Sequence, residues 1–173
     1  MDELGDSEYS KAKSKELWDR VGEELKTYDG KSFLEQFGLY MLRVQMYELY
    51  LKKDLMELFE VPEEKADRMN LASILRYYEK HDIRAHPILY VNLTDIAQQR
   101  NVMAHEFLAL AGTASSIAGE SAMHLFYKDL NRWAMELELA FQQYLILKET
   151  DMLYKDYGVK PTYPYPKYDD GDE

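Results

Sequence analysis

The sequence predicts an all-α protein, an up-and-down bundle of four to five helices. Three observations predict this class. Apolar residues recur at helical spacing over most of the chain, residues that cap or stop helices separate these stretches, and no stretch alternates apolar and polar residues as a strand does. A chain of 173 residues can bury about 70% of the surface that its unfolded form exposes, so one domain is stable without disulfides.

The first two helices are separated by clear signals. The first is expected over about Ser7 to Tyr28, because the stop pair Asp29-Gly30 follows it. Ser32 can cap the second, with Glu35 three residues later as its capping-box partner. We expect that helix to continue to about residue 59, because one apolar stripe runs along it: Phe33, Phe37, Tyr40, Val44, Tyr47, Leu51, Leu55 and Leu58.

A third helix is expected to begin at Pro62, whose missing N–H costs nothing in a first turn. Its inner face is formed by four apolar residues: Leu71, Ile74, Leu75 and Tyr78. Residues 81–87 are expected to form a loop, because a proline restricts the residue before it. Asn92 or Thr94 is then the expected cap of the next helix.

Gly112 is expected to end or break that helix. The last and longest helix should run from about Ser116 to Tyr157, where Gly158 and Pro161 terminate it. The expected organisation is therefore one helical domain over residues 1–161. Residues 162–173, rich in proline, tyrosine and acid, are expected to form a disordered tail.

Composition restricts the classes of function. The net charge of −11 repels nucleic acid and anionic membranes on average. Residues 1–9 and 165–173 carry −7 of this charge, so the rest of the chain is only mildly acidic. The chain has no cysteine, which excludes disulfides and thiolate chemistry. The acidic first residues do not resemble a secretory signal, and no apolar run approaches the roughly 18 residues that span a bilayer. We expect a cytoplasmic protein that does not bind membranes.

Three side chains suggest chemistry. Asn101 and His105 are four residues apart and share a helix face, whereas Arg100 lies roughly 140° from His105 on an ideal helix. A distorted helix would bring Arg100 closer. Histidine can move a proton near neutral pH, arginine can hold a phosphate, and asparagine can orient either group or a sugar hydroxyl. RNA supplies its own nucleophile, the 2′-hydroxyl, so the set suits a phosphodiester.

A structural interpretation competes with this one. An arginine and a histidine on one helix are often a surface ion pair and a hydrogen-bonded core histidine. The segment before the motif is locally cationic in an acidic protein, and this would favour the approach of a phosphate. Its basic residues are Arg76, Lys80, His81, Arg84 and His86. An ordinary solvated loop would look the same. No two of His81, His86 and His124 are four residues apart, the helical spacing at which two histidines can hold one metal ion, so we expect neither a metal nor another cofactor.

The pattern of residues 93–105 resembles HEPN domains, an all-helical family whose hallmark is an arginine, commonly a polar residue after it, and a histidine a few positions on. The resemblance covers residues 31–157, and its specific part is Leu93-x-x-Ile96-x-x-x-Arg100-Asn101-x-x-Ala104-His105. It implies a metal-independent ribonuclease, acting as a toxin or in phage defence, with the Arg and His of two chains facing one another. Carried over, Arg100 contacts the phosphate, Asn101 orients it, and His105 is the catalytic histidine.

The resemblance also leaves an alternative open, because some members of the family are inactive partners of nucleotidyltransferases. The chain could be a non-catalytic helical module that binds such an enzyme or another subunit, and the overall acidity favours this interpretation. In one toxin branch, a tyrosine two positions after the histidine is modified by the antitoxin. Phe107 stands at that position and has no hydroxyl, so we do not expect this regulation here.

A homodimer is expected on two grounds. One arginine and one histidine per chain provide only half of an acid–base pair with its phosphate clamp. The second helix also carries more apolar surface than one stripe requires. A two-fold symmetric dimer closes most simply, because its interface is self-complementary. The expected partners are therefore RNA, a second copy, and an antitoxin or nucleotidyltransferase.

The tail generates the first testable prediction. Deleting residues 162–173 should leave the melting temperature nearly unchanged, because acidic, proline-rich sequence buries almost no apolar surface. Differential scanning calorimetry of the full and shortened chains tests this. A drop of many degrees would show that the tyrosines of the tail dock on the domain.

Overall fold

The computed structural model describes residues 3–118 and 120–154, with side chains over 13–117 and 123–154. These residues are almost entirely helical, as the sequence predicts, and no strand occurs among them. The elements are α1 (Glu3–Leu25) with the 3₁₀ turn η1 (Lys26–Tyr28), α2 (Phe33–Phe59), α3 (Glu63–Asp67), α4 (Leu71–Lys80), α5 (Pro87–Val102), the π-helical turn η2 (Met103–Phe107), α6 (Leu108–Ala118) and α7 (Glu120–Glu149). No helix of the described part is long and apolar enough to cross a membrane.

The beginning of α2 follows the prediction. The Ser32 hydroxyl accepts a hydrogen bond from the Glu35 backbone N–H at 3.4 Å, and the Glu35 carboxylate accepts one from the Ser32 backbone N–H at 2.8 Å. The Ser32 hydroxyl also donates a hydrogen bond to the Glu35 carboxylate at 2.6 Å. This bond and the one from the Ser32 N–H lower the pKa of the Glu35 carboxyl, because they favour its charged form. The capping box is therefore confirmed, and α2 ends at Phe59 as expected.

The prediction of one continuous third helix is wrong. Pro62 precedes the short α3, and α4 begins separately at Leu71. Asn70 caps α4, because its Oδ1 accepts from the Ser73 N–H at 2.9 Å while the Ser73 hydroxyl accepts from the Asn70 N–H at 2.7 Å. These local hydrogen bonds favour a new helix start over continuation of the previous helix.

The predicted caps of the next helix are also wrong. α5 begins at Pro87, and the His86 ring nitrogen Nδ1 accepts a hydrogen bond from the Ile88 N–H at 3.3 Å. Asn92 and Thr94 lie inside α5. The Thr94 hydroxyl donates to the Tyr90 carbonyl one turn earlier, which removes it as a cap.

Gly112 does not end a helix, and Ser116 does not begin one. α6 continues through both, and the Ser116 hydroxyl donates back to the Gly112 carbonyl at 2.9 Å. The last helix starts at Glu120 and ends at Glu149, which is shorter than predicted. The expected stop residues Gly158 and Pro161, like the predicted tail over 162–173, lie outside the described residues.

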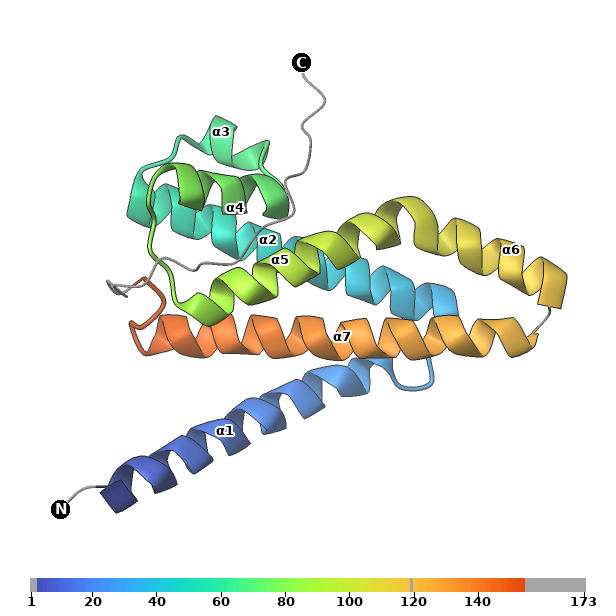
Figure 1. Ribbon diagram of the computed structural model, residues 1–173, viewed down its shortest axis with the longest axis horizontal. Helices are drawn as coiled ribbons and strands as arrows, with labels where there is room; N and C mark the ends of the chain where they lie inside the picture. Colours follow the sequence, from blue (N-terminus) through green and yellow to red (C-terminus); the bar gives the residue numbers. More distant parts are fainter. Residues whose placement is uncertain (1–2, 119, 155–173) are drawn as a thin grey trace.

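α7 is the central element of the bundle. It packs against α1, α2, α5 and α6, while α4 packs against α5 and α3 against α2 (Figure 1). α5, η2 and α6 follow one another without a break but change direction at η2, as helices do at π-helical turns (Figure 1). The rod formed by α5, η2 and α6 therefore lies along α7 and carries the predicted motif at its bend.

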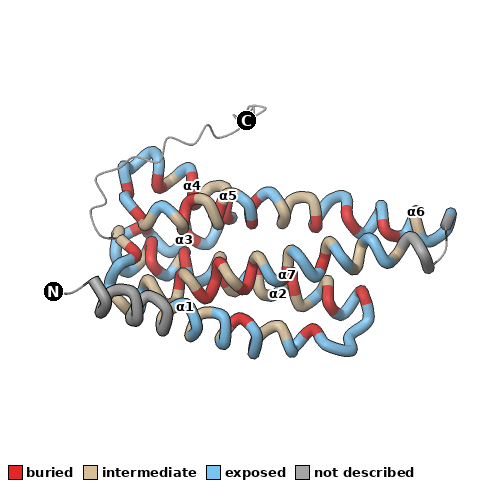
Figure 2. The backbone as a smooth tube through the Cα atoms, turned by 60° about the horizontal axis from the view of Figure 1, so that its bottom comes forward, coloured by how far each residue is buried: buried red, intermediate tan, exposed pale blue. Residues whose placement is uncertain are grey.

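The core lies between α2, α4, α5 and α7, where buried positions repeat at helical spacing (Figure 2). The predicted stripe of α2 is buried along most of its length, although Phe37 is half-buried and Leu58 at its end is exposed. Aromatic residues provide the largest fully buried side chains: Tyr40, Tyr47, Tyr78 and Tyr144.

Asp54 lies fully buried in this core. Its carboxylate accepts hydrogen bonds from the hydroxyls of Tyr144 at 2.7 Å and Tyr154 at 3.0 Å, and it forms an ion pair with Lys148. Burial raises the pKa of the Tyr144 and Tyr154 hydroxyls, so both remain donors at neutral pH. Asp54 therefore links the end of α2 to the end of α7 and to the segment that follows α7.

Replacement of Asp54 tests the importance of this link. Asp54→Ala should lower the free energy of unfolding by about 2–4 kcal/mol, because buried tyrosine hydroxyls lose their acceptor. Urea denaturation followed by circular dichroism measures the change. Glu57→Ala is the matched control, because Glu57 is an exposed acid on the same helix and its removal should cost less than about 0.5 kcal/mol. Equal losses for both variants would contradict the role of Asp54.

Candidate functional site

The three motif residues lie at the bend between α5 and α6. Arg100 and Asn101 are in the last turn of α5, and His105 lies in the π-helical turn η2. A π turn closes its hydrogen bonds over five residues instead of four, so it rotates the chain by less per residue. Arg100 and His105 are five residues apart. The wider turn makes the angle between their side chains around the helix axis smaller than the roughly 140° of an ideal helix.

η2 is held from its buried side. Met103 and Phe107 are buried, whereas the residues between them, Ala104 to Glu106, are exposed. The Phe107 ring packs against Phe33 with ring centroids 5.7 Å apart and against Trp133 at 5.2 Å. Because aromatic contacts from α2 and α7 fix one side of the turn, His105 points away from the core.

The side chains of the motif remain available. His105 is exposed, and among the described residues it has no hydrogen-bond or ion-pair partner. Arg100 is half-buried and donates a long hydrogen bond of 3.4 Å to the amide oxygen of Asn101. Within the described part of the chain, no carboxylate forms an ion pair with Arg100. The site thus offers an unneutralised guanidinium and an accessible imidazole on neighbouring turns.

The cationic segment predicted to approach the motif lies elsewhere. Lys80 ends α4, and His81 and Arg84 lie in the loop before α5, whose first residue, Pro87, is about 20 Å along the helix axis from Arg100. His81 stacks on Tyr77 with ring centroids 4.1 Å apart, and Arg84 is 3.8 Å from the Asp82 carboxylate. These contacts make the segment part of the surface of α4 and α5 in a different region from the motif.

The histidines do not gather with acids. In residues 3–118 and 120–154, no three histidine, aspartate or glutamate side chains are placed to hold one metal ion. His86 is occupied as the cap of α5, and burial lowers the pKa of its imidazole. His124 is exposed on α7.

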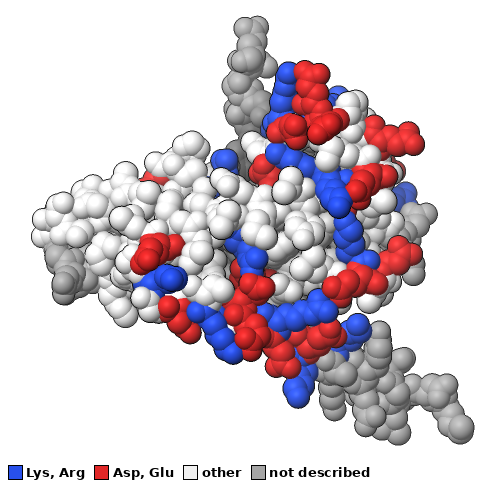
Figure 3. Space-filling model, turned by 180° about the vertical axis from the view of Figure 1, so that it is seen from behind, with Lys and Arg blue, Asp and Glu red and all other residues white. Residues whose placement is uncertain are grey.

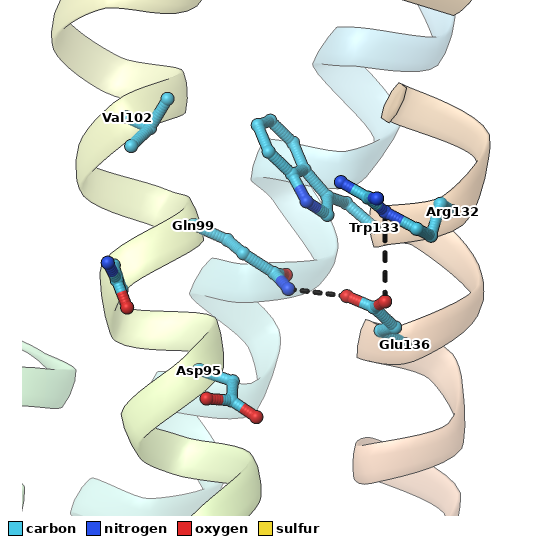
Figure 4. A pocket seen from close by; sticks show the side chains of 7 residues that line it. Asp95, Gln99, Val102, Arg132, Trp133 and Glu136 are labelled. Carbon is cyan, nitrogen blue, oxygen red and sulfur yellow. Dashed lines mark hydrogen bonds and ion pairs between the residues drawn. The ribbon is translucent and has the colours of Figure 1, made fainter. Parts of the chain in front are cut away.

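A pocket that sequence reasoning missed lies beside the motif. It occupies about 380 Å³ between α5 and α7 and is lined by Asp95, Gln98, Gln99, Val102, Arg132, Trp133 and Glu136 (Figure 4). The spacing of 95, 98, 99 and 102 marks one face of α5, which is the signal that the sequence offered. Arg100, Asn101 and His105 are not in its lining, although Val102 is one turn before His105.

Hydrogen bonds fix the polar end of this pocket. The Tyr40 hydroxyl donates to the Gln99 amide oxygen at 3.3 Å, and the Gln99 amide nitrogen donates to Glu136 Oε2 at 2.5 Å (Figure 4). Burial raises the pKa of Tyr40, which therefore stays a donor. The Glu136 carboxylate is thus held in place through Gln99 by a buried tyrosine of α2.

Comparison of the chain with protein-family models, with curated proteins and with solved structures found no match. The function must therefore be inferred from the residues of the site and from their geometry.

The exposure of His105 generates a prediction about stability. His105→Ala should change the free energy of unfolding by less than about 0.5 kcal/mol, because the side chain is exposed and has no described partner. Phe107→Ala, two residues later, should cost about 3–5 kcal/mol, because it removes a buried ring. Thermal and urea unfolding of both variants measure the contrast. A large loss for His105→Ala would show that the histidine is a structural residue.

Proposed function

We propose that the protein is a metal-independent endoribonuclease of HEPN type that acts as a toxin or phage-defence effector. The observation that carries the proposal is the Arg100-Asn101-x-x-x-His105 motif at a π-helical turn, with an exposed histidine and a guanidinium that no described carboxylate neutralises. π-helical turns are rare and occur frequently at functional sites.

The reaction requires a proton transfer and charge stabilisation. The 2′-oxygen of a ribose attacks the adjacent phosphorus and loses its proton to a base, while the 5′-oxygen leaves and takes a proton from an acid. The products are a 2′,3′-cyclic phosphate, which water can then open, and a 5′-hydroxyl end. His105 supplies the proton transfer, and Arg100 stabilises the charge that develops on the phosphate. Asn101 orients the Arg100 side chain, to which it is already hydrogen-bonded.

A second copy completes the proposed site. One imidazole cannot serve as base and acid at the same moment, so His105 of the partner subunit supplies the other proton transfer. α6 follows the motif directly and has no charged residue, but it exposes Leu108, Leu110 and Ile117. Figure 3, which views the molecule from behind, shows charged side chains crowded along the lower edge and over the right-hand part of this face, and few of them over the left-hand end, where α6 lies. Two copies of an acidic protein can approach through this uncharged apolar surface.

A non-catalytic binding module is the second candidate. The same apolar surface of α6 can dock a nucleotidyltransferase or another subunit, and the net charge of −11 opposes binding of RNA. The two candidates differ in what His105 does: the nuclease requires its imidazole, whereas the module does not.

Cleavage of RNA tests the proposal directly. The wild type should cleave single-stranded RNA in the presence of EDTA and leave the DNA of the same sequence intact, because DNA lacks the 2′-hydroxyl. His105→Ala should lower the rate by about 100- to 10,000-fold, which is typical for loss of a general acid or base. Arg100→Lys should also be severely impaired, because lysine keeps the charge but loses the planar fork. Gel analysis of end-labelled RNA, with cyclic-phosphate ends identified by mass spectrometry, measures these effects.

One control variant and one contradicting outcome make the result decisive. His124→Ala removes another exposed histidine and should leave cleavage unchanged. A wild-type protein that is inert on every RNA tested, together with His105→Ala that is equally stable and inert, would favour the binding module.

The assembly is tested separately. Ile117 is 81% exposed, so Ile117→Asp should leave the fold intact. A buried charge should nevertheless shift the dimer to monomer in analytical ultracentrifugation at micromolar concentration, and RNA cleavage should fall with it. Leu58→Asp, at the exposed end of α2 far from α6, is the matched control and should leave the dimer unchanged (Figure 1). A wild type that sediments as a monomer would contradict the dimeric site.

A further inference from the structure

We infer that the pocket between α5 and α7 binds a guanine base, presented either by single-stranded RNA or by a free guanine nucleotide. The inference goes beyond the proposed nuclease, because it concerns binding by residues that lie outside the motif. Its evidence is the separation of the lining into apolar walls and a hydrogen-bonding end (Figure 4).

The apolar walls fit a planar ring. Val102 on α5 and Trp133 on α7 lie on opposite sides of the upper part of the pocket in Figure 4. Trp133 is half-buried, because its indole packs inward on Phe107 while it also lines the pocket. The Phe107 contact fixes the indole in place before any ligand arrives. Proteins bind unpaired bases in such places, by stacking them against aromatic and apolar side chains.

The polar end carries unused acceptors. Glu136 Oε2 accepts a hydrogen bond from Gln99, and Glu136 Oε1 forms an ion pair with Arg132 Nε at 3.9 Å (Figure 4). That distance is too long for a hydrogen bond, so Oε1 can still accept one from a ligand. Asp95 is exposed and forms no hydrogen bond or ion pair among the described residues. Ionised carboxylates only accept hydrogen bonds, so a ligand that binds at this end of the pocket must present donors to them.

This requirement selects guanine among the four bases. The Watson–Crick edge of guanine presents two adjacent donors, N1–H and the 2-amino group, which one carboxylate can accept together. Adenine and cytosine present a ring-nitrogen acceptor beside the amino group, which would face a carboxylate oxygen. Uracil has one donor between two carbonyl oxygens. Glu136 is also the better candidate for the base-reading group than Asp95, because Tyr40 and Gln99 hold it in position.

The charge of the pocket determines where the phosphate lies. Two carboxylates, Asp95 and Glu136, face a single guanidinium, Arg132, which is 3.2 Å from Asp129. The lining is therefore net negative and disfavours a phosphate inside it. The base enters the pocket, and the sugar and phosphate stay at the opening.

Tryptophan fluorescence tests the inference. Trp18 on α1 is replaced by phenylalanine so that Trp133 becomes the reporter, and His105→Ala is included so that RNA remains intact during the measurement. Guanosine monophosphate should quench the emission with a saturable curve. Adenosine, cytidine and uridine monophosphates should bind at least about tenfold more weakly, because each leaves an acceptor unpaired against a carboxylate. Inosine monophosphate, which lacks the 2-amino group, should also bind more weakly.

Variants identify the residue that reads the base. In the same background, Glu136→Gln keeps the shape and the bond from Gln99 but should weaken guanosine monophosphate binding by about tenfold or more, because the amide loses charge and gains donors. Asp129→Asn removes the other acid beside Arg132, outside the pocket lining, and should leave the affinity unchanged. The fold of each variant is checked by its melting temperature.

Two further arms distinguish the sources of the base. Tighter binding of a short single-stranded RNA with one guanine than of the mononucleotide assigns the pocket to RNA, and the reverse order assigns it to a free nucleotide. Equal binding of all four nucleotides, no quenching, or unchanged affinity of Glu136→Gln would overturn the inference. RNA cleavage by a protein that binds no guanine nucleotide and no guanine-containing RNA in the fluorescence assay would overturn the inference but leave the proposed nuclease standing. Guanine binding by a protein that cleaves no RNA would contradict the proposed nuclease and leave the inference about the pocket standing.

Discussion

The buried carboxylate of Asp54 is the constraint on which the arrangement of the bundle depends. A charge that is out of contact with water is tolerated only when hydrogen bonds and an opposite charge surround it. Tyr144, Tyr154 and Lys148 provide them, and all three belong to the end of α7 or to the segment after it. These hydrogen bonds and this ion pair of Asp54 cannot form if α7 slides or rotates against α2. α1, α5 and α6 also pack against α7. The axial position of α7 relative to α2 therefore sets the position of every other long helix.

A second buried carboxylate joins α7 to α2 at an earlier position along both helices. Glu138 is fully buried, and Arg43 of α2 donates to it at 2.5 Å while also pairing with Glu24 of α1. Burial raises the pKa of the Glu138 carboxyl, and the Arg43 guanidinium opposes that rise. The arginine thus joins three helices at one point. Two ionic links between α2 and α7, one at the middle of α2 and one near its end, give this helix pair a specific register that apolar packing alone would leave less defined.

The candidate sites follow from this register. With α2 and α7 fixed, Phe33 and Trp133 receive the Phe107 ring and hold the buried side of η2. The same contact leaves His105 exposed on the outer side of the turn and the indole of Trp133 at the wall of the pocket. Tyr40, again from α2, positions Gln99 and through it Glu136. The motif and the pocket are therefore supported by one set of core residues, although no residue of the motif lines the pocket.

The sequence by itself determined the helical class, the stripe of α2, the capping box of Ser32 and Glu35, and the spacing of Asn101 and His105. These features depend on residues within one or two turns of one another, so their signals are local. The division between α3 and α4, the start of α5 at Pro87 and the continuation of α6 through Gly112 were missed, because several side chains could cap or extend each helix. Only the tertiary structure decided which did. The π turn at His105, the burial of Asp54 and the pocket likewise depend on contacts between residues far apart in the chain, such as Asp54 with Lys148 or Gln99 with Glu136. A polar residue looks alike in sequence whether water or a distant helix satisfies it, so its role appears only when the helices are packed.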